Sequence, residues 1–155
     1  MMRNFRWMGM GVTVLVLVAG CAGVDEESET RPTGRPVLSE TGMQEARTEV
    51  RFERHVKPIL ERRCLACHRG KDLPAGYSLE NRKSAMQAGP RGPRIVPGNP
   101  DRSLLITVVS TGNHGLSMPA VGMQVPDEDI EVLRLWIRQG AKWPDGPAGN
   151  LRAAE

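Results

Sequence analysis

Two cysteines and a histidine near the middle of the chain constrain it more than any other feature. Cys64, Cys67 and His68 are spaced C-x-x-C-H within the stretch RCLACH. Two thiols three positions apart share one helical turn, and the histidine after them offers a ring nitrogen. This is the attachment pattern of c-type haem. We expect one covalent haem c, with Cys64 and Cys67 forming thioethers and His68 as the proximal iron ligand.

Three other readings of the same residues stay open. A C-x-x-C pair can be a thioredoxin-type redox motif, which starts a helix after a strand. It can hold zinc if two more ligands are available, and here only His55, His68 and His114 are. It can also form a structural disulfide. The helical pattern before Cys64 and the export signal described next favour haem.

The first 21 residues have the pattern of an export signal that ends at a cysteine. Arg3 and Arg6 precede a short apolar run, and small residues precede Cys21. The run is shorter than the roughly 20 apolar residues that span a bilayer. The stretch LVAGC resembles the bacterial lipobox, in which the cysteine becomes the acylated first residue. We expect residues 1–20 to be a lipoprotein signal peptide and Cys21 to anchor the protein to lipid in a bacterial cell envelope, at the periplasmic or outer-membrane face; the alternative is an ordinary signal peptide cut nearby.

The segment after the leader is polar. It is rich in acidic, Ser, Thr, Pro and Gly residues and sparse in apolar ones, a composition that favours disorder. We expect residues 21–48 to comprise the lipidated cysteine and a disordered tether, residues 49–144 to form the folded domain and residues 145–155 to be a flexible tail. Without Arg3 and Arg6 the chain has 19 basic residues against 18 acidic ones, a net charge of +1. It contains no long run of basic residues, so its charge pattern gives little support to nucleic-acid binding.

Helical periodicity predicts an all-α domain with long Gly/Pro-rich loops. Residues 50–63 have apolar residues at helical spacing, with Pro58 expected to kink or divide the element. Residues 70–100 are expected to be loop. Residues 103–109 form a short apolar element, helix or strand by pattern alone. Residues 127–139 predict the clearest helix, since they begin with three acidic residues and end before Gly140.

A second iron ligand is expected in the loop before that last helix. Four methionines follow Cys21, and Met118 is the one directly before a proline. Ligation by His68 and Met118 would raise the reduction potential relative to other ligand pairs. Met123, His114 or an open position are the alternatives, and Met118 can also serve only as core packing.

Several motifs in order make the domain similar to a known family. They are FERHVKPIL (52–60), CLACH (64–68), GYSL (76–79), IVPGNP (95–100), SLLI (103–106), the pair Met118-Pro119 and LWIRQGAKWP (135–144). Over about residues 52–144 the chain resembles the class I cytochrome c superfamily, and within it the planctomycete-type cytochrome c domain. The resemblance implies a small helical fold around one haem. The sequence departs from the usual pattern at Tyr77, Arg94 and Ala120, and these departures leave the expected ligand residues themselves unchanged.

These expectations point to electron transfer rather than catalysis. A closed His68/Met118 site leaves no position for a substrate, and no catalytic acid, base or nucleophile is apparent. We expect a single-haem cytochrome that carries electrons between redox proteins of the cell envelope. The alternatives are a five-coordinate haem domain for gas binding or peroxidase chemistry, and a docked haem subunit of a larger oxidoreductase.

The lipid anchor is tested by replacing its acceptor. Cys21→Ser removes the thiol that would take the lipid, so the protein should remain an unprocessed precursor or become soluble. Membrane fractionation and the mass of the product measure this. A Cys21→Ser protein of mature size in the membrane fraction would contradict the anchor.

Overall fold

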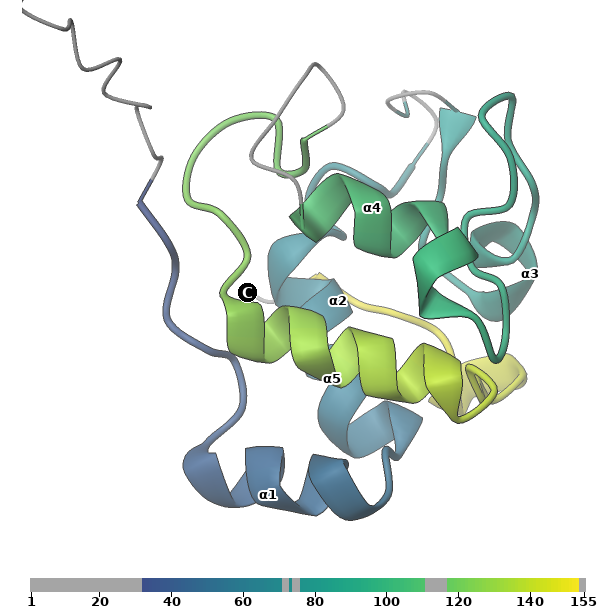
Figure 1. Ribbon diagram of the computed structural model, residues 1–155. Coiled ribbons are helices and arrows are strands. Elements are labelled where there is room, and N and C mark those ends of the chain that lie inside the picture. Colours follow the sequence, from purple (N-terminus) through teal and green to yellow (C-terminus); the bar gives the residue numbers. More distant parts are fainter. Residues whose placement is uncertain (1–31, 71–72, 74–75, 111–116, 154–155) are drawn as a thin grey trace, which may run out of the picture.

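Five α-helices and three short helical turns make up the regular structure of the described residues. The computed structural model describes residues 32–70, 73, 76–110 and 117–153 (Figure 1). The α-helices are α1 (Glu40–Thr48), α2 (Lys57–Arg63), α3 (Arg82–Ala85), α4 (Leu104–Ser110) and α5 (Asp127–Arg138). The turns are η1 (Phe52–Val56), η3 (Pro100–Arg102) and η4 (Gly146–Ala148). Two isolated β-bridges are the only strand-like pairing in these ranges, so the all-α prediction is confirmed. The expected signal peptide, Cys21 and His114 lie outside the described residues.

The first expected helix is divided beside its proline. The wider π-helical turn η1 runs directly into α2, and Pro58 occupies the first turn of α2. A proline is tolerated there because the first N–H groups of a helix have no partner within it. Phe52, Val56 and Ile59 from the two segments are buried. The division expected at Pro58 is therefore observed.

The two later elements are both helices. The undecided stretch 103–109 is helical in α4, where Leu105, Ile106 and Val109 are buried. The spacing of these three residues suits one face of a helix, and strand alternation would not bury all three. Helix α5 ends one residue before the predicted boundary, and Gly140 follows it with a φ of 99°, the left-handed conformation that ends many helices.

Helix α5 organises the core. It crosses the centre of the fold, with α4 on one side of it and α1 on the other (Figure 1). Val132, Leu133, Trp136 and Ile137 of α5 are buried in the main apolar cluster. A smaller cluster consists of Val109, Val125 and Ile130, with Val108 and Met118 packed against it. Helices α4 and α5 contribute to both clusters, so they link the two.

Part of the expected tether is folded. Residues 40–48 form α1, which begins at the Ser39 cap and packs against α5 and η1. The sparse apolar residues of the segment lie on one helical face, so Met43 and Ala46 reach the main cluster. Glu45 adds an ion pair with Arg54, at 2.6 Å from Nε. The prediction of disorder up to residue 48 is wrong for this helix, because burial against tertiary neighbours offsets the ordering entropy that composition alone would leave unmet.

The expected flexible tail is also packed. Leu151 is 7 % exposed and its backbone N–H donates to the Glu80 carbonyl oxygen at 2.9 Å. The Trp143 indole N–H donates to the Gly149 carbonyl oxygen at 2.7 Å. These contacts fold residues 145–151 back onto the domain, so the prediction of a flexible tail is wrong for this stretch. In the part of the chain that the structure describes, no helix has the length and apolar character to cross a membrane.

The packed tail gives a stability prediction. Leu151→Ala should lower the free energy of unfolding by about 2 kcal/mol, because it leaves a cavity in the main cluster. Arg152→Ala, one residue on and exposed, is the matched control and should change it by less than about 0.5 kcal/mol. Urea denaturation measures both, and equal small effects would show that the tail adds nothing to the fold.

Candidate haem site

The C-x-x-C-H residues lie in a tight turn at the end of α2. The Cys64 N–H still donates to the Leu60 carbonyl oxygen at 3.0 Å. The N–H groups of Cys67 and His68 then both donate to the Cys64 carbonyl oxygen, at 3.2 and 3.1 Å. Cys64 is half-buried against the main cluster, Cys67 is exposed, and both thiols are free. The turn therefore holds the two thiols and the imidazole within five consecutive residues.

The His68 ring is oriented by a backbone carbonyl. Its Nδ1 lies 3.0 Å from the Tyr77 carbonyl oxygen. A carbonyl oxygen can only accept, so this contact requires the proton on Nδ1 and leaves Nε2 as the nitrogen with a free lone pair. Metal-ligating histidines commonly have their other ring N–H held in this way. The donor set therefore fits a haem iron bound through Nε2 of His68.

Tyr77 is itself held in place. The ring centroids of His68 and Tyr77 are 5.2 Å apart in an edge contact. The Arg94 guanidinium lies 4.3 Å above the Tyr77 ring centroid and donates to the Gln87 carbonyl oxygen at 2.8 Å. Such a cation–π contact is stabilising in a partly buried setting. The residue that orients His68 thus has support from the following loop.

The Cys64 thiol is held in its neutral, protonated form. Burial raises its pKa to about 12, and Arg63 only partly opposes that shift. A thioredoxin-type cysteine has its pKa lowered so that the thiolate is available. A neutral, apolar thiol fits a residue that forms a thioether and does not suit a redox nucleophile.

Met118 is packed where Met123 is not. The Met118 N–H donates to the Val108 carbonyl oxygen at 2.7 Å, and the half-buried side chain packs against the small cluster. Met123 is 56 % exposed. Of these two candidates for the sixth ligand, Met118 is the one fixed in the fold. Its role as a ligand stays a prediction.

A zinc site finds no support among the described residues. No group of three His, Cys, Asp or Glu side chains in these ranges is arranged to hold a metal ion. By the same finding, Cys64, Cys67 and His68, which all lie in the described ranges, do not form such a group.

A buried ion pair directly before the motif was missed at the level of sequence. Asp129 of α5 is fully buried, and Arg63 donates from Nε to its Oδ2 at 3.2 Å. Burial raises the pKa of Asp129, opposed by hydrogen bonds from the Val37 N–H and from Arg63. One signal was available: Asp129 precedes Leu133 and Trp136 by four and seven positions, so it lies on the apolar face of its helix.

A helical domain with a C-x-x-C-H turn and a histidine oriented by a backbone carbonyl is typical of c-type cytochromes. Residues 64–121 match the family model described as Planctomycete cytochrome C. The match spans the motif and Met118, and it confirms the resemblance noted from the sequence. Proteins of a cytochrome c family carry a covalently bound haem, and the likeness favours the same cofactor here. No curated protein and no solved structure matches the chain.

The environment of Tyr77 gives a pH prediction. Burial raises the pKa of Tyr77, with a smaller contribution from Cys64, and this is the only tyrosine of the chain. Near-ultraviolet absorbance of tyrosinate should therefore report a folded-state pKa well above the ordinary value of about 10. Because the folded pKa is the higher one, the contribution of Tyr77 to stability is complete below about pH 10 and is lost as the pH rises further.

The control is the same titration in denaturant, which should return to about 10. A native protein whose single tyrosine titrates at the ordinary value would contradict the packing around His68.

Proposed function

We propose that this protein is a single-haem c-type cytochrome that carries electrons between redox proteins of a bacterial cell envelope. Cys64 and Cys67 would form the thioethers, His68 would be the proximal ligand and Met118 the sixth. The observation that carries the proposal is the 3.0 Å contact between His68 Nδ1 and the Tyr77 carbonyl oxygen, next to two free thiols. That contact leaves Nε2 of His68 for an iron.

Electron transfer is favoured because the two expected iron ligands, His68 and Met118, are both held in place by the fold. Haem supplies a one-electron iron couple. The His68 ring is held by Tyr77, and Met118 is held by its backbone hydrogen bond and the small cluster. Two fixed ligands suit an iron that keeps the same ligands in both oxidation states. Such a site would pass one electron from a reduced partner to an oxidised one without needing a proton acceptor.

The place of action rests on the leader sequence. A signal peptide over residues 1–20 and a lipidated Cys21 would hold the cytochrome at the periplasmic or outer-membrane face, where its partners would be envelope redox proteins. The alternative functions are gas binding or peroxidase chemistry at a five-coordinate haem, and a docked role in a larger oxidoreductase.

The proposal is tested on the purified full-length protein. After denaturation and removal of free haem, the polypeptide should retain the mass of one haem and one iron. The oxidised protein should show the weak band at the red end of the visible spectrum that marks methionine–iron ligation. Met118→Ala should abolish that band and let the reduced protein bind carbon monoxide.

Met123→Ala is the matched control, because it removes an exposed methionine of the same loop. It should keep the band and resist carbon monoxide. A wild-type protein that lacks the band and binds carbon monoxide readily would overturn the electron-carrier proposal in favour of a five-coordinate haem. A polypeptide that loses all haem on denaturation would overturn the covalent assignment.

A further inference from the structure

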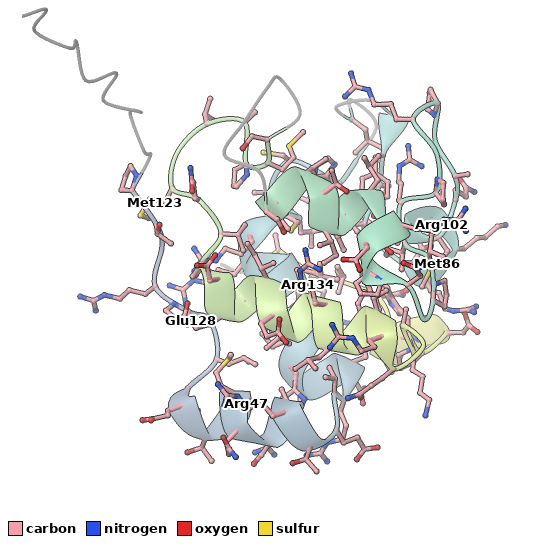
Figure 2. The ribbon with its side chains drawn as sticks, viewed as in Figure 1. Arg47, Met86, Arg102, Met123, Glu128 and Arg134 are labelled. Atoms are coloured by element: carbon pink, nitrogen blue, oxygen red, sulfur yellow. The ribbon has the colours of Figure 1, made fainter. Side chains whose placement is uncertain are left out.

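The extended N-terminal segment crosses the loop that carries Met118. We call residues 32–38 the N-terminal strap and residues 117–126 the Met118 loop. The Gly34 N–H donates to the Gln124 carbonyl oxygen at 3.0 Å, and the Gln124 N–H donates to the Pro32 carbonyl oxygen at 2.9 Å. The strap lies beside the labelled Met123 at the far edge of the loop (Figure 2). The strap thus pairs with the second half of the Met118 loop.

The same strap is fastened to the start of α5. The Val37 N–H donates to Asp129 Oδ1 at 2.8 Å, while Arg63 Nε donates to Oδ2 of the same carboxylate. Arg63 also donates to the Arg35 carbonyl oxygen. One buried carboxylate therefore joins the strap, the end of α2 and the first turn of α5.

These contacts span the two sides of the proposed iron site. Arg63 is covalently next to Cys64, which begins the proximal turn. Asp129 lies three residues beyond the end of the Met118 loop. Since Asp129 is fully buried and the Arg63 side chain is 13 % exposed, the pair is shielded from solvent and resists separation.

We infer that Asp129, Arg63 and the N-terminal strap are positioning elements that hold the Met118 loop closed against the Cys64–His68 turn. Through these hydrogen bonds the second half of the Met118 loop and the start of α5 are connected to Arg63, the residue before Cys64. This inference rests on the proposed His68/Met118 ligation. Loosening these contacts would raise the fraction of molecules in which Met118 is away from the proposed sixth position.

Affinity for an added ligand measures that fraction. Imidazole or carbon monoxide binds only where the sixth position is open, so the apparent affinity scales with the open population. In Asp129→Asn the amide keeps an acceptor for Val37 and loses the charge that pairs with Arg63. The affinity of the oxidised full-length protein for imidazole should rise about tenfold or more, as expected for a lost charged hydrogen bond.

Asp101→Asn is the matched control for that variant. Asp101 of η3 forms an ion pair at 2.8 Å with Arg134, which lies on α5 like Asp129, but the Asp101 side chain is 81 % exposed. Its removal should leave imidazole affinity unchanged.

A second variant acts on the strap without touching the carboxylate. A Cβ at Gly34 would lie 2.6 Å from Arg63 Nη1, so Gly34→Ala must displace the guanidinium. Gly42→Ala is its control, because the added carbon meets Leu38 and Ser39 only at ordinary contact distances of 3.5 and 3.6 Å. Gly34→Ala should raise imidazole affinity and Gly42→Ala should not.

The outcomes separate a positioning role from a purely structural one. Variants that lower the unfolding temperature but leave imidazole affinity at wild-type values, measured well below that temperature, would overturn the inference. The proposed function fails separately, if the wild-type protein itself lacks the methionine–iron band. If Asp129→Asn does not fold, Gly34→Ala against Gly42→Ala decides the matter alone.

Discussion

The carboxylate of Asp129 is the interaction on which the rest of the fold depends. A buried charge is tolerated only when its oxygens are well occupied, and here a backbone N–H and a guanidinium fill them. Because the partners come from the N-terminal strap and from the end of α2, satisfying one side chain brings three distant parts of the sequence together. The helices around it then share a common apolar core through α5.

The proximal side of the site is built on a different principle. The His68 ring is oriented by the Tyr77 carbonyl oxygen, and the Tyr77 ring in turn packs under the Arg94 guanidinium. The imidazole orientation is therefore set by backbone placement, and burial raises the pKa of both Cys64 and Tyr77. A flat, largely apolar cofactor suits such surroundings.

Local patterns predicted what local chemistry determines. Helix α5 and the division at Pro58 follow from periodicity and proline geometry, and the C-x-x-C-H spacing carries its own meaning. Helix α1 and the packed tail were missed, because Ala46 and Leu151 become favourable only against neighbours distant in sequence. The role of the Tyr77 carbonyl oxygen in orienting His68 could not be predicted, because a backbone acceptor has no signature in the sequence. The burial of Asp129 could be predicted in part, since it is an acidic residue on the apolar face of a helix, whereas its partner Arg63 could not.

The N-terminal strap also alters how far the domain would stand from an anchor. Only eleven residue steps separate Cys21 from Pro32, a path of at most about 40 Å even if fully extended. The Gln124 N–H donates a hydrogen bond to the Pro32 carbonyl oxygen, so a lipid at Cys21 would pull on the edge of the molecule that bears Met123. The domain would then approach a bilayer with a preferred side. Its collisions with other membrane-bound proteins would be confined to a thin layer and biased in orientation.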